Sequence, residues 1–474
     1  MAATERCDVV VIGGGPAGST VASYLAKDGF DVVVLERAVF PRDHVGESLL
    51  PFCYGIFEEL GLLEQISERY VRKPGVRFLD VDGVTDTTYC FHLKIKDPSY
   101  LSFQVLRSEF DELLLNHSAH LGATVHQGTK VEAVDFRGPE DIVVRAVSPT
   151  GETTAVEARF VVDASGRETF LANRLNTKTA HKELARSALS SHWKGAKYEG
   201  GLEEGMIQIV YTGGEKLGWI WVIPLSTDRL SVGVVMNTSY FRAERLKLKQ
   251  QGIDAWQQAL YSQELAQSPF TKHILDGADQ FWPIQYNGDY SYFCKEKWGD
   301  DFALCGDASA FIDPIFSSGV YLAMNSGRLL SAALATRLRE GVEKGREAFT
   351  ETYELIVGAY ELVDKLIRVF YTPEAINFAQ LGHAEGAFED FEHHRNAMGL
   401  QHFLLAGDFF QQANRYSEFV DELRTPKMFQ RYQALVMDRD TFQAPAERSC
   451  DHTHEQVFHP KLAEYDRIRA ERGI

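Results

Sequence analysis

A glycine-rich turn, GGGPAG at residues 13–18, joins an apolar run to a helical segment near the start of the chain. Gly13 permits a tight turn, Gly15 lets the backbone approach a pyrophosphate, and Gly18 allows the helix to pack on the strand. The N–H groups at the start of the helix and its dipole attract phosphate. A second apolar run ends in Glu36, whose carboxylate can accept hydrogen bonds from a ribose. The spacing predicts a βαβ unit that binds an adenine dinucleotide.

A single lysine, Lys73 in the segment RKPGVRF, precedes the apolar run at 76–79 that we expect to be a strand. If this lysine is partly desolvated, its pKa falls and its amine becomes reactive. The competing interpretation is an ordinary solvated lysine. The residues alone do not separate the two.

Two tryptophans, Trp219 and Trp221, alternate in the strand-like segment GWIWVIP at 218–224. Alternation places both indoles on one face of a strand, where they form a bulky wall. They can shield a reactive group or simply fill the core of a sheet.

The segment FIDPIFSSGV at 311–320 ends in Ser317, Ser318 and Gly319, just before a helix expected over 320–338. Backbone N–H groups and the positive end of a helix dipole bind an anion without a formal cation. Shortly upstream, Asp307 in GDA stands at the end of an apolar strand and beside a helix start. A carboxylate placed there suits a polyol, with helix capping as the alternative.

Composition restricts the partners of this 474-residue chain. Its 49 Lys and Arg against 67 Asp and Glu give a net charge of −18, which disfavours direct binding to nucleic acid or to an anionic membrane. Small molecules or proteins are the expected partners. The six cysteines show no C-x-x-C spacing, so we expect them to be reduced packing residues. No leader precedes the first strand, and a cytoplasmic location is the default expectation.

Three separated pieces, GGGPAG at 13–18, DASGR at 163–167 and GDA at 306–308, occur in the order seen in flavoprotein monooxygenases, which the chain resembles over at least residues 1–335. The resemblance implies FAD as cofactor. The cofactor contacts that it implies are Gly13, Gly15, Pro16, Ala17, Gly18, Glu36, Arg37, Glu47, Ser48, Arg107, Asp163, Ala164, Gly306, Asp307 and Gly319.

Within that class the chain resembles the flavin-dependent halogenases of the phenol and pyrrole type. The W-x-W-x-I-P motif is matched by Trp219, Trp221, Ile223 and Pro224; K-x-G-x-x-F by Lys73, Gly75 and Phe78; F-x-x-P-x-x-S-x-G by 311–319; and a Gly-Glu-Ser turn by 46–48. Such a turn can close the flavin site, with a helix cap formed by Ser48 as the alternative.

The resemblance implies that reduced FAD, oxygen and halide form hypohalous acid, which passes the tryptophan wall to Lys73 for electrophilic substitution. The implied halide site, for chloride or bromide, comprises Pro314, Ser317, Ser318 and Gly319. No second dinucleotide fingerprint appears, which favours reduced FAD supplied by a separate flavin reductase. The substrate implied is an electron-rich phenol or pyrrole of secondary metabolism, free or tethered to an acyl or peptidyl carrier protein.

One departure concerns the substrate. Tryptophan halogenases carry a glutamate two positions before the residue matching Ser318, and this chain has Phe316 there, which puts indole in doubt. His92, His192 and Tyr286 are weak candidates for assisting phenol deprotonation. A carrier protein, usually acidic, needs a basic patch for docking, and the compact candidate is Arg245, Lys247 and Lys249.

The expected fold is mixed α/β: a Rossmann-like FAD-binding domain of the para-hydroxybenzoate hydroxylase and glutathione reductase type, interleaved with an antiparallel sheet and followed by a helical C-terminal region. The expected boundaries are 1–72 with 105–185 and 286–340 for the FAD domain, 73–104 with 186–285 for the substrate domain, and 341–474 for the helical region. A hydroxylating monooxygenase, a geranylgeranyl-reductase-like reductase of isoprenoid chains and a flavin-binding protein without activity remain as alternatives, because fold cannot separate them.

Overall fold

The computed structural model describes residues 5–380, with gaps at 94, 96–97, 199–204, 289–290, 373–374 and 376, and the short stretches 404–410, 416–417, 420–421 and 424. The chain forms two compact units, each built from three separate stretches. The first unit comprises residues 1–46, 106–182 and 291–360, and the second comprises 47–105, 183–290 and 361–474. Among the described helices, none is long and apolar enough to cross a membrane.

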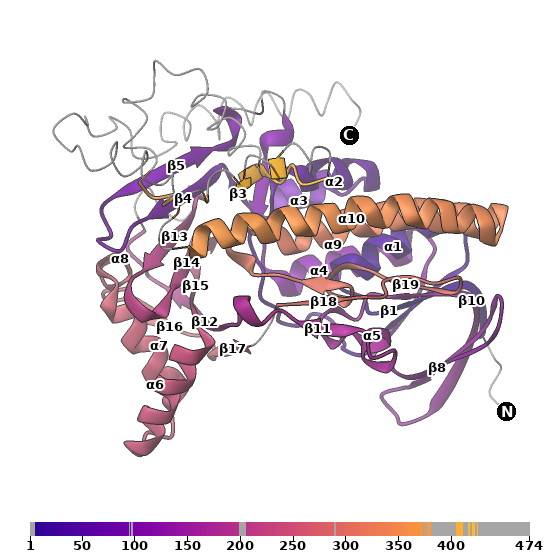
Figure 1. The fold of residues 1–474 in the computed structure, drawn as a ribbon, viewed down its shortest axis with the longest axis horizontal. Coiled ribbons are helices and arrows are strands. Elements are labelled where there is room, and N and C mark those ends of the chain that lie inside the picture. Colours follow the sequence, from indigo (N-terminus) through magenta and orange to yellow (C-terminus); the bar gives the residue numbers. More distant parts are fainter. Residues whose placement is uncertain are drawn as a thin grey trace. The chain divides into compact units, whose positions relative to one another are not determined.

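A largely parallel sheet forms the centre of the first unit, with strand order β7-β2-β1-β10-β9-β8 and β19 beside β10 (Figure 1). Its strands are β1 (Glu5–Ile12), β2 (Val32–Glu36), β7 (Thr124–Gln127), β8 (Lys130–Gly138), β9 (Asp141–Val147), β10 (Thr153–Asp163) and β19 (Phe302–Leu304). Three short strands form a second sheet, namely β11 (Lys178–Ala180), β18 (Tyr292–Cys294) and β20 (Ala310–Phe311). The helices are α1 (Pro16–Lys27), α4 (Arg107–His120), α5 (Phe170–Arg174), α9 (Ser318–Glu340) and the first part of α10 (Val342–Tyr371).

The pairing of β1 explains why its sequence is continuously apolar. It pairs in parallel with β2 on one side and with β10 on the other, and Val9, Val10 and Val11 are fully buried. A strand covered on both faces needs apolar residues at every position. Helix α1 packs against α4 and α9. The predicted βαβ unit is therefore confirmed.

The second unit contains a sheet of order β16-β12-β15-β14-β13-β4-β5, with β17 beside β12, and a small β3–β6 ribbon (Figure 1). Its strands are β3 (Val71–Lys73), β4 (Gly75–Leu79), β5 (Asp86–Cys90), β6 (Ser102–Gln104), β12 (Arg186–Lys194), β13 (Ile207–Thr212), β14 (Gly218–Ser226), β15 (Arg229–Asn237), β16 (Asp279–Gln280) and β17 (Gln285–Gly288). Its helices are α2 (Tyr54–Leu60), α3 (Leu63–Arg69), α6 (Thr238–Gln250), α7 (Trp256–Gln267), α8 (Pro269–Ile274) and the end of α10.

Alternation along these strands builds two different faces. Ile220, Val222 and Leu189 point to a core that also contains Phe241 of α6 and Leu260 of α7. The other set of side chains, including both tryptophans of β14, therefore belongs to the opposite face. The predicted antiparallel sheet is confirmed for β12 to β15, whereas β13 pairs in parallel with β4 because a long connection, rather than a hairpin, joins them.

Two other expectations differ from the structure. Residues 47–72 lie in the second unit and 341–360 in the first, unlike the expected boundaries. Cys90 is disulfide-bonded, which contradicts the prediction that all cysteines are reduced. The expected helical C-terminal region continues α10 to Tyr371, and its remainder lies largely outside the described residues.

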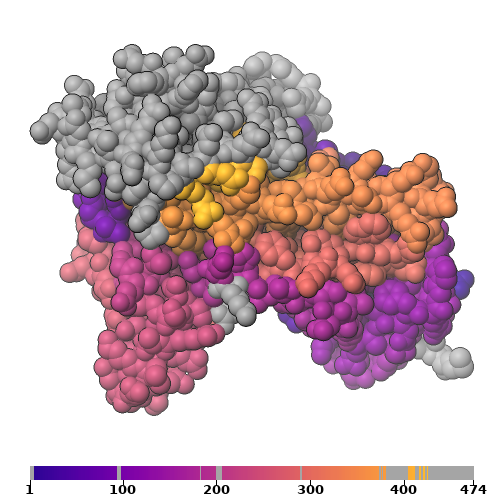
Figure 2. Space-filling model, viewed as in Figure 1, coloured from indigo at the N-terminus to yellow at the C-terminus, as the bar shows by residue number. Residues whose placement is uncertain are grey.

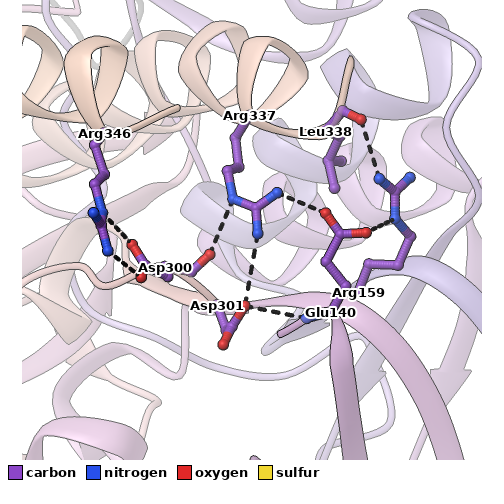
Figure 3. Close-up of polar contacts among 7 residues, drawn as sticks. All are labelled: Glu140, Arg159, Asp300, Asp301, Arg337, Leu338 and Arg346. Carbon is purple, nitrogen blue, oxygen red and sulfur yellow. Dashed lines mark hydrogen bonds and ion pairs between the residues drawn. The ribbon is translucent and has the colours of Figure 1, made fainter. Parts of the chain in front are cut away.

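A buried arginine anchors the end of α9 to the sheet of the first unit (Figure 3). Arg337 is 1% exposed, and its guanidinium donates to Glu140 Oε1 at 2.7 Å and to the Asp300 carbonyl at 3.2 Å. Asp301 Oδ1 lies 3.7 Å from the third nitrogen. Each guanidinium nitrogen thus faces an oxygen, which is how a buried charge is tolerated.

Two more arginines extend the same network. Arg159 of β10 donates to Glu140 at 3.0 Å and to the carbonyl of Leu338 at 3.0 Å. Arg346 of α10 makes a two-pronged contact with Asp300, at 2.7 and 2.6 Å (Figure 3). The network fixes the junction of α9 and α10.

Candidate functional site

The glycine turn of the first unit leaves the start of α1 open. Gly13 has φ 102°, and a Cβ on Gly18 would lie 1.9 Å from the Gly13 carbonyl oxygen, so neither position accepts a side chain. At Gly15 an added Cβ would meet only Arg42, at 3.5 Å, and no side chain caps the helix. Uncapped N–H groups beside a glycine with free space fit a dinucleotide phosphate. The residues present therefore fit FAD.

Two predicted cofactor residues already have protein partners. Glu36 is 6% exposed and accepts hydrogen bonds from the amides of Gly14 at 2.6 Å and Ala38 at 2.7 Å. Its carboxylate shapes the turn and keeps further lone pairs for a ribose. Arg37 is mostly exposed and pairs with Glu168.

Arg107, at the start of α4, holds the loop that follows β2. It forms a two-pronged ion pair with Asp111, at 2.7 and 2.9 Å, and donates to the carbonyls of Val45 at 3.0 Å and Gly46 at 3.1 Å. Arg107 is 5% exposed. Its guanidinium therefore fixes the backbone of the Gly-Glu-Ser turn up to Gly46.

Two aspartates sit at the strand ends of the first unit. Asp163 is fully buried and accepts from the amides of Ser165 at 3.0 Å and Leu171 at 2.6 Å, so it shapes the DASGR turn. A Cβ added to Gly13 would lie 2.5 Å from the carbonyl oxygen of Ala164, the residue that follows Asp163. Asp307 differs, because burial raises the pKa of its carboxyl to about 6 against the opposing charges of Arg107 and Arg167.

A short stretch before α9 provides a candidate anion site. Pro314 begins a 3-10 turn ending at Phe316, Ser317 takes φ 56°, and α9 starts at Ser318. The Ser318 side chain is 1% exposed, and its Oγ has no hydrogen-bond partner among the described residues. A Cβ added to Gly319 would meet nothing within 4 Å. Open space, an unpaired hydroxyl and free helix N–H groups together suit a halide.

The second unit buries Lys73 almost completely, at 2% exposure. Its Nζ donates to the carbonyl of Leu49 at 2.8 Å and lies 5.6 Å from the centre of the Phe91 ring. No carboxylate of a described residue forms an ion pair with it. Burial lowers the pKa of Lys73 to about 7, against a smaller opposing effect of Cys53. The solvated-lysine interpretation does not describe this side chain.

Both tryptophans lie on one face of β14, as alternation predicted. Their ring centres are 5.6 Å apart, and both are nearly buried. Trp221 lies over Gly233 of β15, where a Cβ would come within 2.1 Å of the indole, and its Nε1 donates to Ser231 at 3.2 Å. Trp219 donates to the hydroxyl of Tyr371 at 2.8 Å. Ile223 follows on the same face, and Pro224 stands at a β-bulge.

The Gly-Glu-Ser turn contributes a second polar feature to this unit. Glu47 is 4% exposed, and its Oε1 lies 2.9 Å from Nε2 of His192. Ser48 is buried, bridges to Gln104 of β6, and has an Oγ without a hydrogen-bond partner among the described residues. From the sequence, His192 was only a weak candidate for assisting phenol deprotonation. Strand alternation in β12, which places it opposite Ser231, was the signal that could have raised it.

The other minor candidates are less suitable. Tyr286 is 44% exposed and stacks on Phe241, and His92 packs edge-on to Tyr100. The patch of Arg245, Lys247 and Lys249 is exposed on α6, which Figure 2 shows at the surface in rose. Two of its charges are engaged locally, Arg245 over the Trp256 ring and Lys247 with Glu244.

Comparison with known proteins agrees with the geometry of both units. Residues 6–357 match the FAD binding domain family. A tryptophan 2-halogenase of Chondromyces crocatus is 34% identical over 79% of this chain and 72% of that protein. A 1H-pyrrole-2-carbonyl-[peptidyl-carrier protein] chlorinase of Pseudomonas fluorescens is 31% identical over 77% of this chain and 83% of that protein.

A solved structure gives the same result for the fold. The myxobacterial chondrochloren halogenase, described as a variant of FAD-dependent halogenases, superposes with a TM-score of 0.71 at 30% identity, covering 90% of this chain and 97% of that one. The nucleotide turn, the buried lysine and the paired tryptophans are thus found in a chain that is similar to these three halogenases. The protein belongs to the flavin-dependent halogenases.

Proposed function

We propose that this halogenase acts on an electron-rich aromatic ring, a phenol or a pyrrole, with Lys73 as its catalytic residue. The observation that carries the proposal is the burial of Lys73 with a single carbonyl acceptor and a pKa lowered to about 7. At neutral pH a large share of this amine is uncharged. An uncharged amine can bond to an electrophilic halogen, whereas an ammonium can donate a hydrogen bond to hypohalous acid. Either state aims the halogen at the ring.

The first unit is the proposed FAD-binding domain. Gly13, Gly15, Pro16, Ala17 and Gly18 would hold the pyrophosphate, Glu36 and Arg37 the adenosine side, and Arg107, Asp163, Ala164, Gly306, Asp307 and Gly319 the rest of the cofactor. When bound in its reduced form, FAD supplies the electrons with which oxygen is activated to oxidise halide. Asp307, whose pKa is raised to about 6, can hold or share a proton with a polyol hydroxyl. We propose that a separate flavin reductase delivers the reduced cofactor.

Halide binding is assigned to Pro314, Ser317, Ser318 and Gly319. The unpaired Ser318 Oγ can donate a hydrogen bond, and the space beside Gly319 gives an anion access to the N–H groups of α9. A helix of this length carries its full dipole at that end. Chloride and bromide are both acceptable at such a site.

The second unit is the proposed substrate domain. Trp219, Trp221, Ile223 and Pro224 form a rigid apolar face, held by the two indole hydrogen bonds. We propose that this face keeps the organic substrate away from the reduced cofactor, so that halide is the nucleophile that gets oxidised. Arg107 donates to the carbonyls of Val45 and Gly46, directly before Glu47 and Ser48. We propose that Glu47 and Ser48 contact the cofactor.

The substrate class rests on two observations. Phe316 occupies the position of the glutamate in tryptophan halogenases, and it is an apolar residue, 3% exposed, that cannot accept a ring proton. An activated phenol or pyrrole needs less assistance than indole. The similarity to a pyrrole-carrier chlorinase supports a carrier-tethered substrate as one option, and the similarity to a tryptophan 2-halogenase makes indole the competing one. Docking of a carrier would use Arg245, Lys247 and Lys249.

The test supplies the purified protein with reduced FAD, oxygen and one halide at a time. Free phenols, free pyrroles, tryptophan and a pyrrole loaded on a carrier protein are offered in parallel, and product masses are recorded. We expect halogenated phenol or pyrrole, and no product without halide. Halogenated tryptophan as the main product would overturn the substrate assignment, and hydroxylated product in halide-free buffer would favour a monooxygenase.

A further inference from the structure

His192 and Glu47 form a buried pair within the second unit. The Nε2–Oε1 distance is 2.9 Å, and the side chains are 12% and 4% exposed. An ionised carboxylate only accepts hydrogen bonds, so Nε2 carries the hydrogen, and in the neutral ring Nδ1 then carries the lone pair. The carboxylate thereby fixes both the tautomer and the orientation of the imidazole.

The nitrogen that holds the lone pair has no protein partner. His192 Nδ1 is buried and makes no hydrogen bond to any described residue. The ring is held from one side by Trp282, whose centre lies 5.5 Å away at an interplanar angle of 28°. An acceptor without a protein donor, on a ring held in place by stacking and by a carboxylate, meets the geometric requirement for a base whose partner is supplied by the substrate.

His192 belongs to the same face of the sheet as the paired tryptophans. It lies opposite Ser231 in the pairing of β12 with β15, and Ser231 accepts the hydrogen bond of Trp221. The strand β14, which carries the tryptophans, also packs against β3 and β6, and β3 ends in Lys73. The wall and the imidazole therefore share one face of the sheet, and the strand that ends in Lys73 packs against the strand that carries the wall.

The Glu47–Leu49 stretch holds both reactive groups. The side chain of Glu47 binds His192, and the carbonyl of Leu49 accepts from Lys73 Nζ. This stretch is itself fixed against β6, since Leu49 N donates to the Phe103 carbonyl and Val105 N to the Glu47 carbonyl.

We propose that His192, positioned by Glu47, is the base that takes the hydroxyl proton of a phenolic substrate while the ring accepts halogen. The inference rests on the proposed function and narrows its substrate class to phenols. The O–H bond breaks, the proton moves to Nδ1, and the electron pair enters the ring as the carbon–halogen bond forms. The halogen–oxygen bond of hypohalous acid breaks, and the departing hydroxide takes the ring proton to give water. His192 then returns its proton to the product.

The test compares resorcinol with its dimethyl ether, which has the same activated ring and no acidic proton. His192→Gln keeps a donor for Glu47 in the position of Nε2 and removes the basic nitrogen. We expect kcat/KM for resorcinol to fall about 100-fold or more, and the value for the ether to change less than about 3-fold. A fluorinated resorcinol with a more acidic hydroxyl should recover part of the loss.

Two further variants complete the design. Glu47→Gln leaves the imidazole in place but removes the carboxylate that positions it. We expect kcat/KM to fall more for resorcinol than for the ether, by a smaller factor than in His192→Gln. This variant keeps the proposal testable if His192→Gln fails to fold. His126→Gln removes an exposed His–Glu pair of the same 2.9 Å length and should change nothing. Equal losses on resorcinol and ether, or no loss on either, would overturn the role of His192. A wild-type protein that halogenates neither compound would overturn the phenol assignment itself.

Discussion

Arg337 and Lys73 are both cations with 2% or less of their surface exposed, yet their surroundings differ completely. Arg337 faces Glu140, Asp301 and a carbonyl, so that each of its nitrogens has an oxygen partner (Figure 3). Lys73 has a carbonyl and an aromatic ring. A buried charge that faces carboxylates belongs to the architecture, and one without a facing carboxylate keeps its capacity for chemistry at a cost in folding free energy.

The largest effect is expected from exchanging each cation for methionine, which matches its length and flexibility. Lys73→Met should lower the halogenation rate by at least about 100-fold while leaving the melting temperature unchanged or higher, because no acidic partner is stranded. Arg337→Met should instead cost about 3 kcal/mol of unfolding free energy, because two carboxylates lose their partner, and should retain the rate per folded molecule. Thermal unfolding and product formation, measured on both variants, check the contrast. Loss of stability in the lysine variant with activity preserved would break it.

The difference in stability between the wild-type protein and Lys73→Met should also depend on pH in a defined direction. Lys73 has a folded pKa of about 7 against 10.5 for an unperturbed lysine, so the unfolded chain binds more protons between these values. Wild-type stability therefore rises through this window relative to Lys73→Met. The unfolding free energy of Lys73→Met should exceed that of the wild type most below pH 7, by several kcal/mol or less. This difference should vanish near pH 10.5. A constant difference across the range would contradict the lowered pKa.

The halide site should respond to a smaller change. Gly319→Ala puts a methyl group into the space at the start of α9, so the KM for halide should rise about 10-fold, an interaction loss of roughly 1.4 kcal/mol. Stability should hold, since the added Cβ meets no atom and alanine favours helices. Gly55→Ala is the matched control, a glycine at the second position of α2 that also has nothing within 4 Å. The KM for halide is measured by halide titration of both variants. An equal change in the two variants would contradict an anion site at Gly319.

The smallest effect is expected at the exposed end of the arginine network. Arg346 and Asp300 are 58% and 40% exposed, so their two-pronged contact is strongly screened by solvent. Arg346→Met should cost less than about 1 kcal/mol. The unfolding free energies of Arg346→Met and Arg337→Met are measured with denaturant. Their comparison tests whether burial, rather than the number of hydrogen bonds, sets the contribution of each arginine to stability. A loss as large as that of Arg337→Met would show that it does not.

The sequence predicted what depends on neighbouring residues. The glycine turn, the strands from β12 to β15 and the shared face of Trp219 and Trp221 follow from local spacing and alternation, and the structure confirms them. The helix expected over 320–338 is confirmed as α9, which ends at Glu340 just before Gly341.

What the sequence did not predict depends on residues distant in the chain. The surroundings of Lys73 include the Leu49 carbonyl, Cys53 and the Phe91 ring, which precede and follow it at a distance in the sequence. The partner of Glu47 lies 145 positions away on a strand of the large sheet. The two amide contacts of Glu36 and those of Asp163 likewise required coordinates, since carboxylates that shape a turn and carboxylates that bind a ligand look identical in sequence.

The most direct test of the account is the pKa of the Lys73 amine, followed through its ε-carbon signal by NMR and assigned by comparison with Lys73→Met. The account predicts a midpoint of about 7 in the folded protein. A midpoint at or above 10 would mean that the amine is solvated and permanently charged, and the role assigned to it would fail.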